Sequence, residues 1–142
     1  MPILSPRDQA AVRKEFERIG GPVKLVVFSQ SLEAAELCQQ NEQLMREVAE
    51  LSDQITVEVL NLAIDRERAE AYGVDQVPAI VVEGSRDYGI RFYGVPLGYE
   101  FSNLIDSIIV ASTGEPVLSE DTLASLRALA ADVDIKVFST PT

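Results

Sequence analysis

Cys38 is the side chain of this sequence with the widest chemical repertoire, because a thiolate can act as a nucleophile, a redox group or a metal ligand. It is the only cysteine among the 142 residues. In a dithiol motif of the form Cys-x-x-Cys the second cysteine follows the first by one helical turn, and the residue one turn before Cys38 is Ala35. If residues 35–38 are compared with such a motif, alanine stands in the first place and the attacking thiol is missing.

The amino-acid composition excludes several classes of catalytic, metal and nucleic-acid site. The absence of histidine excludes Ser-His-Asp and Cys-His nucleophilic sites and every His-ligated zinc site. The 12 Lys and Arg residues against 23 Asp and Glu give a net charge of −11, which repels phosphate backbones and anionic lipid. A single cysteine favours a reducing compartment. We therefore expect no cofactor, no metal, no nucleic-acid or membrane partner, and a cytoplasmic location.

A second feature is Val77-Pro78, which directly precedes the apolar run of residues 79–82. Proline cannot donate a hydrogen bond to a β-ladder, so it suits the beginning of a strand. The aromatic residues between positions 88 and 101 are interpreted as core and hairpin packing, because the acidic charge argues against a nucleic-acid stacking surface.

Apolar periodicity and turn residues predict the helices and strands that carry Cys38 and Val77-Pro78. Cys38 falls on the apolar stripe of a predicted helix, one turn inside its beginning. A strand-helix-strand crossover followed by a hairpin and a closing helix predicts an α/β fold, with a mixed β-sheet sandwiched by helices. The expected elements are a helix over 6–19, a strand over 23–28, a helix over 32–51, a strand over 54–60, a helix over 65–72, a hairpin of 77–82 with 90–93, and a helix over 99–110.

The C-terminal part of the chain repeats its beginning after a shift of 110 residues. The matched pairs are Pro6 with Pro116, Phe16 with Leu126, Ile19 with Leu129, Leu25 with Ile135, Val27 with Val137 and Phe28 with Phe138. We expect residues 1–112 to form one domain, and residues 113–142 to form a linker, a helix and a strand that begin a second, truncated unit. The alternative is an ordinary helix with an edge strand that docks on the same domain.

Four segments, residues 22–28, 48–51, 72–79 and 91–101, together resemble the N-terminal unit of the glutaredoxin-like protein disulfide oxidoreductases, which consist of two fused thioredoxin folds. The chain also resembles the N-terminal domain of the flavoprotein component of alkyl hydroperoxide reductase, whose first fold has lost its cysteines. The resemblance covers nearly the whole chain and implies a thioredoxin-like fold. In both families the segment that matches residues 135–142 runs into the active Cys-x-x-Cys of the second fold.

The resemblance also implies roles for particular residues. Val77-Pro78 matches the family's cis-proline, whose neighbouring backbone groups bind an extended peptide or a thiol substrate. Cys38 matches the second, resolving cysteine, and Ala35 stands in the motif without a thiol, so no catalytic set is intact. Two interpretations of Cys38 stay open: a small core-facing hydrophobe, or a partner in a mixed disulfide with another protein or a second fold.

The function expected from these features is a degenerate thioredoxin-like module of a thiol-disulfide oxidoreductase. It would serve as scaffold and docking domain for an adjoining thioredoxin-like fold that carries Cys-x-x-Cys, and protein thiols or disulfides would be the substrates. The parent would be a protein disulfide oxidoreductase, with this chain inactive by itself. The alternatives are a monothiol glutaredoxin-like enzyme that uses Cys38, and an interaction module without a redox role.

Overall fold

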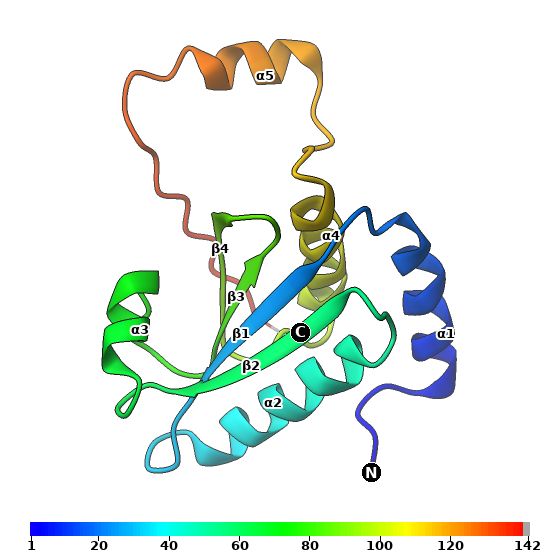
Figure 1. Ribbon diagram of the computed structural model, residues 1–142, viewed down its shortest axis with the longest axis vertical. Coiled ribbons are helices and arrows are strands. Elements are labelled where there is room, and N and C mark those ends of the chain that lie inside the picture. Colours follow the sequence, from blue (N-terminus) through cyan, green and yellow to red (C-terminus); the bar gives the residue numbers. More distant parts are fainter. Residues whose placement is uncertain (141–142) are drawn as a thin grey trace.

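The computed structural model describes residues 1–140 and shows a mixed sheet between helices, followed by an extended C-terminal arm (Figure 1). The elements in chain order are α1 (Pro6–Glu15), a 3-10 turn η1 (Phe16–Arg18), β1 (Val23–Ser29), α2 (Ala35–Ala49), β2 (Ile55–Asn61), α3 (Arg66–Tyr72), β3 (Ala79–Glu83), β4 (Asp87–Tyr93), α4 (Tyr99–Thr113) and α5 (Glu120–Arg127).

The four strands form one sheet in the order β2-β1-β3-β4. β1 is parallel to β2 and antiparallel to β3, and β3 is antiparallel to β4. The register places Leu25 of β1 opposite Val57 on one side and opposite Val82 on the other. The α/β class and the mixed sheet predicted from the sequence are therefore confirmed.

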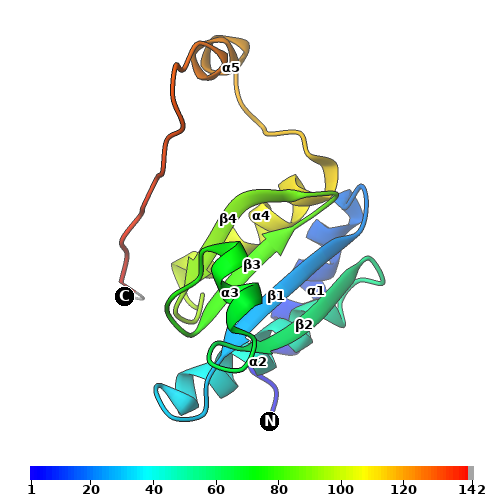
Figure 2. The same ribbon diagram turned by 60° about the vertical axis from the view of Figure 1, so that its left-hand side comes forward.

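Helices cover both faces of this sheet (Figure 2). Alternate residues of β1 enter two apolar clusters: Leu25 and Val27 belong to the first, and Val26 and Phe28 belong to the second. The first cluster is completed by side chains of α1, α2 and α4, and the second by α3 through Ala69. All four β1 side chains are fully buried, as expected for a central strand between two helical layers.

The beginnings of the first two helices differ in their local chemistry. Ser5 caps α1 by accepting a hydrogen bond from the Asp8 backbone N–H at 3.1 Å, and Pro6 occupies the first helical position. The helix expected over 32–51 begins only at Ala35, so its predicted beginning was wrong. Ala34 has a left-handed backbone (φ 52°, ψ 34°), which a right-handed helix cannot include.

The C-terminal arm contains one helix and no strand among the residues that the structure describes. α5 begins after Ser119, whose side chain accepts a hydrogen bond from the Thr122 backbone N–H. The strand expected at residues 135–138 is not formed, and neither is the alternative edge strand on this domain. A strand needs a partner for its backbone groups, and this segment pairs with neither edge of the sheet. Pro141 and Thr142, the end of the expected second unit, lie outside the described residues.

Over residues 1–140, no helix is both long enough and apolar enough to cross a membrane.

Candidate functional site

Cys38 is enclosed in the protein although it lies near the beginning of α2. Its side chain is 1% exposed, and its thiol is free. Its backbone N–H donates to the carbonyl oxygen of Ala34 at 2.9 Å, which closes the first turn of the helix. The expected position of Cys38 on the buried face of α2 is therefore confirmed.

Ala35 is the first residue of α2 and is half-buried. The N-terminus of a helix is the place where backbone N–H groups stabilise an anion such as a thiolate. Here that place carries a methyl group, so the helix end has no nucleophile to activate.

Val77 and Pro78 precede β3 and are joined by a cis peptide bond. Pro78 is buried, and its carbonyl oxygen accepts a hydrogen bond from the Gly94 backbone N–H at 2.9 Å. Val77 is half-buried, and within residues 1–140 no backbone hydrogen bond of Val77 is found.

The sheet register brings the two sequence-predicted places to one end of the sheet. Phe28, next to the last residue of β1, lies opposite Ala79, the first residue of β3. The loop that follows β1 and the Val77-Pro78 segment that precedes β3 therefore lie at the same end of the sheet, on neighbouring strands. The Leu62 backbone N–H donates to the Ser29 carbonyl at 3.0 Å, which brings the β2–α3 loop to the same end.

Four large apolar side chains are exposed around this end, and we call them the apolar rim. They are Leu32 (87% exposed), Ile64 (82%), Tyr93 (44%) and Tyr99 (80%). They belong to the loops after β1 and β2, to the last residue of β4 and to the first residue of α4. The interpretation of Tyr93 and Tyr99 as core packing was wrong. Their proximity to Gly94 and Gly98, which mark a turn in the sequence, was the available signal.

Asn41 is an unusual neighbour of Cys38, one turn later on the same buried face of α2. Its side chain is 0% exposed, and neither its Oδ1 nor its Nδ2 has a hydrogen-bond partner among the described residues. A buried amide without partners opposes folding by about 1–3 kcal/mol. The sequence analysis did not single out Asn41, because a polar residue on an otherwise apolar stripe was the only signal.

Charged residues form structural networks away from this end. Glu58 of β2 accepts hydrogen bonds from Arg68 and Lys24, which lower its pKa to about 2.

At the apolar rim itself, burial, and then the charge of Asp75, raise the pKa of the Tyr93 hydroxyl. The described residues contain no group of three or more His, Cys, Asp or Glu side chains that could hold a metal ion.

No family model matches the chain. Among curated proteins, NADH dehydrogenase of Ferdinandcohnia aciditolerans is 26% identical over 125 residues, which is 88% of this chain and 21% of that protein. The alkyl hydroperoxide reductase protein AhpF of Escherichia coli is 23% identical over 137 residues, 96% of this chain and 24% of that protein. A probable thioredoxin of Methanothermobacter thermautotrophicus is 39% identical over 57 residues, 40% of this chain and 62% of that protein. The chain thus spans less than two thirds of each of these relatives.

Solved structures show the same fold. The alkylhydroperoxide reductase protein AhpF of Enterococcus faecalis superposes with a TM-score of 0.79 at 20% identity, over 89% of this chain and 61% of that chain. A protein disulfide oxidoreductase of Aeropyrum pernix superposes with a TM-score of 0.77 at 24% identity, over 91% of this chain and 56% of that chain. Together with the order and directions of its strands, these likenesses identify the chain as a thioredoxin-fold unit.

Proposed function

We propose that this chain is a degenerate thioredoxin-like module of a thiol-disulfide oxidoreductase, and that it serves as scaffold and docking domain for an adjoining redox-active fold. Ala35 and Cys38 are then the remnant of the motif, and Val77 and Pro78 hold an extended peptide or a thiol substrate. The observation that carries the proposal is the 1% exposure of Cys38 behind a helix end that has no thiol.

The chemistry of exchange explains why turnover is not expected from the chain alone. A thiolate must reach a disulfide sulfur, form a mixed disulfide and then be released by a second thiol. Cys38 is enclosed, and the sequence contains no second cysteine that could release the product. The enclosure of Cys38 also argues against a monothiol enzyme that uses it, because the attacking thiolate must be accessible.

Docking is supported by the unpaired backbone of Val77 beside the apolar rim. An extended peptide binds an open backbone segment through main-chain hydrogen bonds, and side-chain contacts with nearby apolar groups add specificity. Leu32 and Ile64 are largely exposed, so they offer such contacts without rearrangement of the fold.

An adjoining fold is supported by the apolar side chains of the C-terminal arm. Ile135, Val137 and Phe138 are 79%, 83% and 92% exposed, and the matched residues Leu25, Val27 and Phe28 are fully buried in β1. Covering such a row of side chains requires another sheet or helix layer. We propose that a second thioredoxin-like fold with Cys-x-x-Cys supplies it, in the cytoplasm, where a lone cysteine stays reduced.

The redox part of the proposal is tested by disulfide reduction and thiol labelling. We expect this chain to show no insulin reduction above buffer, and Cys38→Ser to behave identically. Labelling of Cys38 by a maleimide should be at least about 100-fold slower in the native protein than in the unfolded protein, because burial limits access. Turnover that disappears in Cys38→Ser, together with fast native labelling, would contradict the proposal and favour a monothiol enzyme.

The docking part is tested with carboxymethylated insulin B chain as the probe. Titration into the isotopically labelled protein should shift the amide signals of Val77 and Ala79. The double variant Leu32→Ser/Ile64→Ser should weaken binding about five-fold, because it removes two apolar contacts. The matched control, Val117→Ser/Leu118→Ser, removes two exposed apolar side chains from the segment between α4 and α5 and should change binding less than two-fold. Equal losses in both variants would show non-specific binding.

A further inference from the structure

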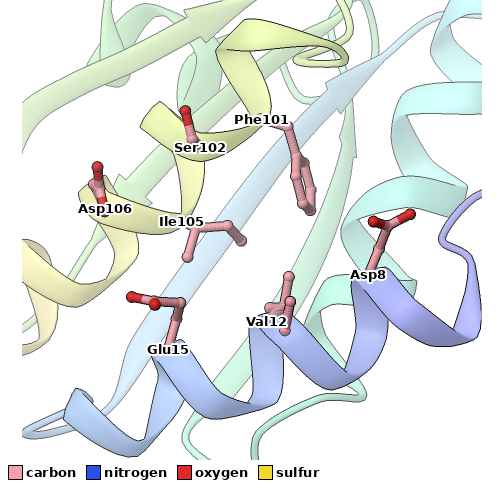
Figure 3. Close-up of a pocket in the computed structure, with 8 residues that line it drawn as sticks. Asp8, Val12, Glu15, Phe101, Ser102, Ile105 and Asp106 are labelled. Atoms are coloured by element: carbon pink, nitrogen blue, oxygen red, sulfur yellow. The ribbon is translucent and has the colours of Figure 1, made fainter.

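A groove of about 460 Å³ lies between α1 and α4, separate from the proposed docking site (Figure 3). All of its lining residues come from these two helices. None comes from the β1–α2 loop, the Val77-Pro78 segment or the apolar rim. Its volume falls in the range of small binding sites, about 300–1,000 Å³.

The floor of the groove is apolar. Val12 of α1 and Ile105 of α4 face each other between the helices, and Phe101 closes one end (Figure 3). Val12 and Ile105 are each about 5% exposed, and they belong to the first apolar cluster. The groove thus opens onto the core itself, and a side chain seated there would contact a rigid surface.

The rim of the groove is acidic. Asp8 and Glu15 lie along the α1 side and Asp106 lies on the α4 side, and no basic residue lines the groove. Asp8 accepts a hydrogen bond from the neutral Ser5 hydroxyl at 2.6 Å, and only Glu15 has a cation beside it, the exposed Arg18. The rim therefore keeps most of its negative charge.

Ala11 keeps the groove open. It is an exposed residue of α1 between Asp8 and Glu15, and it contributes only a methyl group to the lining of the groove. Glu15 follows Asp8 by seven positions, which is a rise of about 10 Å, or two helical turns. Basic groups two turns apart on a helical ligand match this separation.

We propose that the groove binds a basic amphipathic helix of a partner protein. One apolar side chain of that helix lies against Val12 and Ile105, and Lys or Arg residues one to two turns away lie beside the rim carboxylates. Charge complementarity selects this partner over a second copy, because two chains of net charge −11 repel each other.

The probe is an amidated 14-residue helical peptide with leucine along one face and lysine on both sides of it. Titration at 50 mM salt should give saturable one-to-one binding, with amide shifts at Ala11, Val12 and Ile105. The double variant Glu15→Gln/Asp106→Asn should weaken binding about five-fold. Ala11→Gln, which fills the groove with a good helix former, should weaken it at least about ten-fold while the melting temperature stays unchanged.

The matched control is Glu36→Gln/Glu67→Gln, which removes two exposed carboxylates from α2 and α3 and so makes the same change in net charge. It should change the affinity less than two-fold. An equal loss in both double variants would overturn the proposal, since the binding would then depend on diffuse charge. Equal binding of the peptide with glutamate in place of lysine, or concentration-dependent dimerisation blocked by Ala11→Gln, would also overturn it.

Discussion

Ala35 and Cys38 lie one helical turn apart on α2. A cysteine in place of Ala35 would complete a Cys-x-x-Cys dithiol. The methyl group of Ala35 stands at the helix end, where backbone N–H groups would stabilise a thiolate. Cys38 is left as a fully buried group whose neighbour on the same face, Asn41, has no hydrogen-bond partner among the described residues. The first turns of α2 thus bury a thiol and an amide, Cys38 and Asn41, at positions where apolar side chains would pack equally well.

Ala34→Gly is expected to stabilise the protein by about 0.5–1 kcal/mol. The backbone of Ala34 is left-handed, a conformation that glycine adopts without steric cost. Urea unfolding measures the change. Ala10→Gly in the middle of α1 is the control and should instead destabilise by about 1 kcal/mol. Destabilisation by both substitutions would show that the conformation of Ala34 carries no strain.

Asn41→Leu is expected to raise the free energy of unfolding by about 1–2 kcal/mol. Leucine has the same number and branching of side-chain heavy atoms as asparagine, and the substitution removes two buried polar atoms that lack partners among the described residues. Denaturant titration monitored by circular dichroism gives the value. A loss of stability in Asn41→Leu, with Leu44→Met as a nearby control for repacking, would mean that the amide is satisfied in solution.

Glu58 joins three elements, because its carboxylate on β2 accepts hydrogen bonds from Lys24 of β1 and Arg68 of α3. The Arg68 Nη1 atom lies 2.7 Å from its Oε1. Glu58 is paired with Val26 across the parallel strands, so the network lies beside the second apolar cluster. These contacts link α3 to β1 and β2, the two strands that carry Lys24 and Glu58.

Glu58→Gln is expected to lose stability only where the native carboxylate is ionised. Arg68 and then Lys24 lower the pKa of Glu58 from its ordinary value of 4.5 to about 2, so the folded state binds fewer protons than the unfolded state. The stabilisation is complete above pH 4.5 and disappears as the pH falls through about 2. Unfolding at pH 7, 4 and 2.5 should therefore show a difference from the parent of roughly 0.5–1 kcal/mol that shrinks with pH.

Glu67→Gln removes an exposed carboxylate of α3; it is the control for that series and should show no such trend. A difference between Glu58→Gln and the parent that stays constant over the whole pH range would contradict the assignment.

Residues 1–114 contain every residue of the two apolar clusters, and the arm of residues 115–140 runs out from α4 through α5 and then returns toward the domain (Figures 1 and 2). A hydrogen bond of 2.6 Å joins the Ser139 hydroxyl to Glu100 at the start of α4. No side chain of α5 is buried. The described residues thus form one packed unit and an arm whose apolar side chains are largely exposed.

Removal of residues 115–142 is expected to leave the free energy of unfolding unchanged within about 0.5 kcal/mol, because the arm buries no apolar side chain. Denaturant unfolding of the shortened protein tests this. Leu4→Ala shows that the assay is sensitive: Leu4 is 6% exposed in the core, and its loss should cost about 2 kcal/mol or more. A loss of similar size on removal of the arm would mean that the arm packs on the domain.

Apolar periodicity over a few neighbouring residues was enough to predict the class of fold, the central strand and the position of Cys38 on an apolar helix face. It also determined that the motif lacks a thiol. The beginning of α2 depends on the three-dimensional fold, because the left-handed turn at Ala34 is set by the path from β1 into the helix. The fold also accounts for the exposure of Tyr93 and Tyr99, for the lack of a partner of Asn41 among the described residues and for the absence of a strand at residues 135–138. Exposure and hydrogen bonding depend on which groups lie nearby in space. A strand in particular needs the backbone of another segment as its hydrogen-bond partner.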